Sequence, residues 1–129
     1  MEITYLVDTN IFLEILLVQD RREDCKRFLN DNIGKLSISD FSLHSIGVIL
    51  FRNNNATSFE RFAEDVLKRV EIVSLDKALY NEIPSISKQL GLDFDDTYQC
   101  AVAKQQGLTI VTMDTDFNKA VQTIKIDFL

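Results

Sequence analysis

The sequence alternates short apolar runs with longer segments of helical periodicity, and this alternation limits its fold more than any other feature. Residues 3–7 form a nearly continuous apolar run, which is typical of a strand buried on both faces of a parallel sheet. In residues 56–70, apolar side chains recur at intervals of three and four, which fits one face of a helix. The alternation predicts a three-layer α/β/α fold with a mostly parallel central sheet of four to five strands.

The same patterns assign an element to most of the chain. The predicted strands cover residues 3–7, 35–38, 71–75, 108–112 and 123–126. The predicted helices cover residues 11–16, 20–32, 40–50, 56–70, 79–90, 94–106 and 117–121. Thr9 and Asn10 are the expected caps of the first helix, and Ser39 or Asp40 caps the third. Pro84 conflicts with an unbroken helix over 79–90, because a proline inside a helix kinks or splits it.

Size and charge restrict the classes of protein that fit. A chain of 129 residues predicts a single domain over 1–129. Its apolar stretches fall short of the ~20 residues that span a bilayer. Since the N-terminus also lacks a secretory pattern, we expect a cytoplasmic protein without membrane contact. The net charge of −6 disfavours a basic surface for nucleic acid, so a nucleic-acid ligand would need bound cations or a local patch.

Three aspartates stand where the predicted topology brings chain segments together. Asp8 directly follows the first strand, and Asp114 follows the strand 108–112. Asp96 lies in the first turn of the helix that leads into that second strand. In open parallel sheets, ligands bind beyond the carboxyl ends of the strands, so these carboxylates are predicted to share one pocket. Taken singly, Asp96 also fits a helix N-terminal acid and Asp114 a turn residue.

Crowded carboxylates call for a counterion. Two of them ~4 Å apart repel by about 1 kcal/mol in water and about 4 kcal/mol at an effective dielectric near 20. Ligands that are all oxygen favour hard cations, Mg²⁺ or Mn²⁺, over zinc. Such a cation can activate water and neutralise charge on a phosphate. The pattern therefore indicates metal-dependent chemistry on a phosphate ester.

Three motifs resemble those of the PIN domain family, the fold of toxin-type ribonucleases in bacterial and archaeal toxin–antitoxin pairs. Residues 6–12 (LVDTNIF) resemble the opening motif of the family. Residues 95–103 (DDTYQCAVA) resemble its third motif, in which an aspartate opens an alanine-rich helix. Residues 107–117 (GLTIVTMDTDF) resemble its final strand and the acidic ending that follows. The resemblance spans the chain in the expected order.

The resemblance implies roles for seven residues. Asp8, Asp96 and Asp114 would be catalytic metal ligands, and Asp116 an outer or second-metal carboxylate. Thr9, Asn10 and Thr112 would support these ligands or bind the substrate phosphate. The implied activity is an endoribonuclease dependent on Mg²⁺ or Mn²⁺ that hydrolyses single-stranded or structured RNA. The implied partners are a second copy of the chain, as a homodimer, and an antitoxin protein.

The chain departs from the family pattern at one position. The family usually places a glutamate in the helix after its second strand, where this chain has Ser45. A serine hydroxyl is a poorer ligand for a hard cation and cannot act as a carboxylate base. Asp40 could replace this glutamate only if its helix began later than predicted. His44 lies about 100° from Ser45 around the helix. The alternative function is a degenerate PIN domain that acts as a non-catalytic binding or regulatory module.

A phosphoryl-aspartate mechanism also places an aspartate after the first strand. The sequence supports this mechanism poorly. Phosphatases of this kind have an Asp-x-Asp pattern, whereas Asp8 is followed by Thr9 and Asn10. The phosphoryl-aspartate mechanism is therefore the third hypothesis for Asp8.

Overall fold

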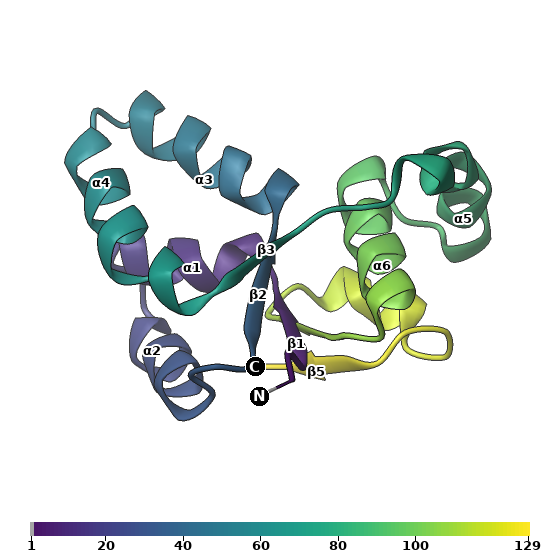
Figure 1. The fold of residues 1–129 in the computed structure, drawn as a ribbon, viewed down its shortest axis with the longest axis horizontal. Helices are drawn as coiled ribbons and strands as arrows, with labels where there is room; N and C mark the ends of the chain where they lie inside the picture. The colour runs from purple at the N-terminus through teal and green to yellow at the C-terminus, as the bar shows by residue number, and fades with distance from the viewer. Residues whose placement is uncertain (1) are drawn as a thin grey trace.

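The computed structural model describes residues 2–129 and contains a five-stranded sheet in the order β3-β2-β1-β4-β5 (Figure 1). Every neighbouring pair of strands is parallel. The strands are β1 (Tyr5–Val7), β2 (Leu36–Ser39), β3 (Glu71–Val73), β4 (Thr109–Thr112) and β5 (Ile126–Phe128). The order reverses at β1, which pairs with both β2 and β4. The carboxyl edge beside β1 is therefore the place where ligands bind in such sheets.

Helices cover both faces of this sheet, which confirms the predicted three-layer α/β/α architecture (Figure 1). One layer contains α1 (Thr9–Leu16), α2 (Arg22–Asp31), α3 (Asp40–Arg52), α4 (Ala56–Asp65) and the short 3₁₀ helix η1 (Leu67–Arg69). The other contains η2 (Lys77–Glu82), α5 (Ile83–Leu90), α6 (Phe94–Gln106) and η3 (Thr115–Ala120). Within residues 2–129, none of the helices combines the length and the apolar character needed to cross a membrane.

Two apolar cores lie on opposite faces of the sheet. Leu6 and Ile110 pack into the core under α5 and α6, whereas Val7 and Val111 pack into the core under the first helical layer. Successive side chains of a strand point to opposite faces, so one short apolar run supplies both cores. This is why residues 6–7 of β1 and 110–111 of β4 are all apolar, as a strand buried on both faces requires.

Several predicted boundaries differ from the structure. The helix predicted over 79–90 is divided into η2 and α5, because Pro84 occupies the first turn of α5, where its missing N–H is tolerated. The helix predicted over 56–70 stops at Asp65 and continues as the 3₁₀ turn η1.

The last predicted strand, 123–126, is also misplaced. Thr123 and Ile124 instead form a turn whose amides donate to the carbonyl of Ala120, and the strand begins at Ile126, opposite Ile110. The register with β4 sets this start, and an apolar pattern alone cannot show it.

Candidate metal centre at the sheet edge

The carboxyl ends of β1 and β4 meet because the two strands pair in register, with Val7 opposite Val111. Asp8 follows β1, and Asp114 lies just beyond β4. The crossover through α6 returns to β4, so the N-terminal turn of α6, with Asp96, lies at the same edge. The parallel topology therefore gathers carboxylates from three separate segments.

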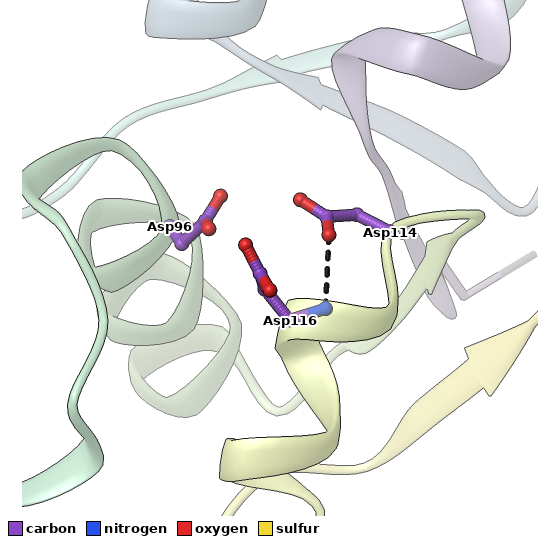
Figure 2. Close-up of side chains that lie close together, drawn as sticks. All are labelled: Asp96, Asp114 and Asp116. Carbon is purple, nitrogen blue, oxygen red and sulfur yellow. Dashed lines mark hydrogen bonds between the residues drawn. The ribbon is translucent and has the colours of Figure 1, made fainter.

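Asp96, Asp114 and Asp116 form the tightest part of this gathering. Each offers a carboxylate oxygen, and these oxygens lie within 4.8 Å of one another. Figure 2 shows the three side chains pointing toward a common space between α6 and η3. Asp96 and Asp114 are half-buried and Asp116 is exposed. The arrangement leaves room for a cation that all three can reach.

Asp8 lies beside this triad and lines the same pocket as Asp96 and Asp114, a cavity of about 220 Å³. It is buried, and both of its carboxylate oxygens accept hydrogen bonds. Oδ2 accepts from Thr112 Oγ1 at 2.7 Å, and Oδ1 accepts from the amide of Thr9 at 2.9 Å. Asp8 therefore caps α1 itself, and the expected capping by Thr9 or Asn10 is wrong. The extended backbone of Asp8 lets its short carboxylate reach the Thr9 amide.

Thr112 connects the two acids that flank it. Its hydroxyl donates to Asp8 and accepts from the amide of Asp114 at 2.9 Å. Asp114 in turn accepts from the amide of Asp116 at 2.9 Å and caps η3 (Figure 2). Thr112 is fully buried, so it orients Asp8 and Asp114 from behind.

The other two residues expected near the substrate lie at the pocket wall. Thr9 is half-buried, and its hydroxyl donates to Ser42 Oγ at 2.7 Å. Asn10 is exposed at the mouth of the pocket. Of these two side chains, Asn10 is the one more open to a ligand.

The electrostatics of the pocket favour a cation. Burial raises the pKa of the Asp8 carboxyl, against hydrogen bonds from Thr112, Thr9 and Gln99 that lower it. Burial also raises the pKa of Asp96 to about 7, helped by the negative charges of neighbouring acids. Those neighbours are Asp93, Asp114, Asp8 and Asp116. Within residues 2–129, the ion pairs lie in the segment 21–27 on and beside α2, away from these acids.

The donor set fits a hard divalent cation. The converging groups are carboxylate oxygens, which Mg²⁺ and Mn²⁺ prefer. The nearby thiol of Cys100 is buried, and burial with the charges of Asp96 and Asp8 raises its pKa to about 12. Burial thus favours the neutral form of the Cys100 thiol.

The structure also locates the residues considered in place of the missing glutamate. Ser45 lines the acidic pocket. His44 instead lines a separate apolar hollow formed by α3 and α4. Asp40 accepts a hydrogen bond from the Tyr98 hydroxyl at 2.7 Å. Helix α3 begins at Asp40, directly after its cap Ser39. The later helix start that would let Asp40 replace the glutamate is therefore wrong.

Two polar residues of the pocket lining were missed by sequence reasoning. Asp95 is exposed at the pocket rim, and Gln99 is buried in its wall. Gln99 follows Asp96 by three residues and so shares its helix face, which is the only sequence signal that could have indicated it.

Comparison with known proteins agrees with this geometry. The PIN domain family matches residues 5–122, and the chain therefore belongs to the PIN domain family. No curated protein matches the chain. The FitAcB structure from Neisseria gonorrhoeae is similar, with 25% identity and a TM-score of 0.73 over 95% of this chain and 96% of that one.

Two further solved structures share the fold. The VapBC-1 structure from nontypeable Haemophilus influenzae has 16% identity and a TM-score of 0.74, over 99% of this chain and 98% of that one. A toxin–antitoxin complex from Klebsiella pneumoniae has 21% identity and a TM-score of 0.72, over 88% and 90% of the two chains. At these identities the similarity concerns the fold alone.

Proposed function

We propose that this PIN domain is a metal-dependent endoribonuclease of the toxin type, which hydrolyses RNA phosphodiester bonds with Mg²⁺ or Mn²⁺. The observation that carries the proposal is the convergence of the Asp96, Asp114 and Asp116 carboxylates beside buried Asp8. Carboxylates this close repel one another unless a cation lies between them.

Each residue has a distinct part in this proposal. Asp8, Asp96 and Asp114 would hold the catalytic cation, and Asp116 would be an outer or second-metal ligand. Thr112 and the Thr9 amide orient Asp8 by occupying one lone pair of each carboxylate oxygen. When bound, the cation supplies an activated water and offsets charge on the phosphate. Asn10, at the mouth, is the side chain offered to the RNA backbone.

The test is cleavage of unstructured and structured RNA with Mg²⁺ or Mn²⁺, in parallel with EDTA. We expect cleavage only with the divalent ion, and a loss of at least 100-fold in Asp8→Asn and Asp114→Asn, about the contribution of a catalytic charge-stabilising group. Asp20→Asn, an exposed acid outside the pocket, is the matched control and should retain activity. Metal-independent cleavage, or full activity of Asp8→Asn, would contradict the proposal.

A second candidate function is a degenerate PIN domain that binds or regulates without catalysis. The observation that favours it is Ser45, which lines the pocket where the family usually has a glutamate. If the wild type is inert and Ser45→Glu gains metal-dependent cleavage, the native chain is non-catalytic. His44→Glu is the control, because it adds the same carboxylate one residue away in the apolar hollow. Robust wild-type turnover would argue against this candidate.

The proposal extends to partners. One of the similar structures is a toxin–antitoxin complex, and a net charge of −6 would favour a basic antitoxin segment. We propose an antitoxin partner, a homodimer and, with an RNA substrate, a cytoplasmic site of action. Light scattering of the purified chain tests the dimer, which requires twice the 14.8 kDa chain mass. A monomeric mass at micromolar concentration would contradict it.

A further inference from the structure

Gln99 is a buried polar side chain in the wall of the acidic pocket. It lies on α6 one turn beyond Asp96 and is 2% exposed. The pocket that it lines also contains Asp8, Asp96 and Asp114. Residues three apart on a helix share a face, so Gln99 and Asp96 approach the pocket from the same side.

One end of the Gln99 amide is anchored by a group of hydroxyls. Its Nε2 donates to Ser42 Oγ at 2.9 Å. Ser42 Oγ is also bonded to the hydroxyls of Thr9, at 2.7 Å, and Ser39, at 3.1 Å. These contacts connect the N-terminal turns of α1 and α3 to the middle of α6. The orientation of the amide is thus held by three elements of the fold.

The other end of the amide is unpaired. Gln99 Oε1 is buried, and no hydrogen-bond donor among residues 2–129 reaches it. The N–H end of the amide is the paired one, through its hydrogen bond to Ser42 Oγ at 2.9 Å. Oε1 is therefore the free end.

A buried acceptor without a donor destabilises a protein unless a ligand or water supplies the donor. The pocket has a volume of about 220 Å³, enough for several waters, and its acids attract a divalent cation. Mg²⁺ and ions like it keep part of their hydration shell in protein sites, and those waters are strong donors. The free oxygen and the acids thus suit the same hydrated ion.

We propose that Gln99 is a positioning residue of the metal centre, whose Oε1 accepts a hydrogen bond from a water bound to the cation. The inference rests on the proposed metal centre and adds to it a neutral hydrogen-bond acceptor on the pocket wall. Because Ser45 removes the usual glutamate, Gln99 provides an oxygen on this side without adding another negative charge to the acids already present.

The test measures Mn²⁺ binding to the full chain by the electron paramagnetic resonance signal of free Mn²⁺, without any RNA. Gln99→Leu removes both amide atoms at similar volume and should weaken Mn²⁺ binding 10- to 100-fold, the usual effect of losing a group that supports metal ligands. Gln106→Leu is the matched control on the same helix. Its side chain donates to the carbonyl of Ser74, outside the pocket, so binding should stay within twofold.

A second variant decides the case if Gln99→Leu folds poorly. Gln99→Glu keeps the size of the side chain and places a carboxylate where the amide oxygen lies. If this position faces the ion, Mn²⁺ should bind at least tenfold more tightly. If it faces only protein, the affinity should stay within twofold, which would overturn the inference.

The outcomes separate this inference from the proposed function. If Asp96→Asn abolishes Mn²⁺ binding but Gln99→Leu leaves it unchanged, Gln99 meets ordinary water only, and the metal centre stands without it. If Gln99→Leu weakens binding but the wild type cleaves no RNA, the inference holds and the nuclease proposal fails. If the wild type binds no Mn²⁺ at all, both are overturned.

Discussion

At the scale of single residues, the same side chains serve both local structure and the pocket. Asp8 caps α1 and Asp114 caps η3, while both face the acidic cavity. An N-terminal helix position offers free backbone N–H groups and a positive dipole end, which partly offset the negative charge of these acids. Capping and ligand binding are therefore compatible roles for one carboxylate, and neither excludes the other.

Thr112 is the residue whose loss should affect this arrangement most directly. Thr112→Val keeps the shape but removes the donor to Asp8 Oδ2 and the acceptor for the Asp114 amide. Because Asp8 is buried, we expect a loss of about 1.5–3 kcal/mol in the free energy of unfolding. Urea denaturation at neutral pH measures it. Thr109→Val, at the opposite end of the same strand, should change stability by less than about 0.5 kcal/mol. Equal effects of the two variants would contradict the linking role of Thr112.

Asp96 predicts how stability depends on pH when divalent ions are absent. Its pKa rises from 3.8 to about 7, through burial and the charges of Asp93, Asp114, Asp8 and Asp116. Between these values the folded chain keeps a proton that the unfolded chain has released, so stability falls as pH rises from about 4 through about 7. The melting temperature in EDTA should therefore decrease between pH 5 and pH 8, and Asp96→Asn should flatten that decrease. If the melting temperatures of the wild type and Asp96→Asn change with pH in parallel, Asp96 is not the group responsible.

At the scale of elements, the turns that lead into helices place the acids, and the caps at the helix ends hold those turns. The turn from α5 to α6 leads to Asp93, which caps α6 and so orients the first turn that carries Asp96. It begins at Gly91, whose left-handed backbone (φ 70°) closes α5. An added Cβ there would contact only the Lys119 side chain, at 3.9 Å, so the constraint is in the backbone.

Gly91→Ala should destabilise the fold by about 1–2 kcal/mol, because a residue with a Cβ pays this penalty in the left-handed region. Gly47→Ala is the contrasting variant. Gly47 lies inside α3, where a Cβ would sit 3.4 Å from the Phe59 ring, an ordinary contact. Alanine is favoured over glycine inside helices by roughly 0.5–1 kcal/mol, so this variant should be neutral or stabilising. Thermal unfolding compares the two, and a greater loss from Gly47→Ala would show that α3–α4 packing dominates.

At the scale of the whole molecule, a net charge of −6 disfavours binding of the proposed RNA substrate unless cations take part. The acidic pocket is the place where bound divalent ions would change the local sign of charge. RNA binding should therefore depend on the kind of cation as well as on total ionic strength.

For a non-cleavable RNA analogue, we expect at least tenfold tighter binding with Mg²⁺ than with a monovalent salt at equal ionic strength. Asp114→Asn should remove most of this difference, because it takes away one of the three converging carboxylates. Fluorescence anisotropy measures the affinities. Equal binding with and without divalent ions would indicate that RNA is held by a surface other than this pocket.

Much of the fold follows from local patterns. The apolar run at β1 predicted a strand buried on both faces, and the run at β4 predicted a strand. Apolar spacing predicted α2 and α3, and the acids and glycine at its two ends predicted α6, all within a few residues. The boundaries that were predicted wrongly lie where contacts with other segments set the ends of an element. Strand β5 begins where it pairs with Ile110, and Pro84 lies in the first turn of α5 because the chain changes from η2 to α5 just before it. Such choices depend on contacts between segments that a one-dimensional pattern does not contain.

The sequence by itself determined the α/β class, the PIN family motifs and the acids that follow β1 and β4, because periodicity and strand-end position are local properties. The family resemblance already named Asp116 and Thr112. Only the tertiary structure decided that the Asp116 carboxylate lies within 4.8 Å of Asp96 and Asp114, that the Thr112 hydroxyl donates to Asp8, and that Gln99 in the pocket wall has an unpaired oxygen. These relations depend on the strand order β3-β2-β1-β4-β5 and on the packing of α6 against it. Distances between side chains far apart in sequence are set when the chain closes, and local patterns cannot specify them.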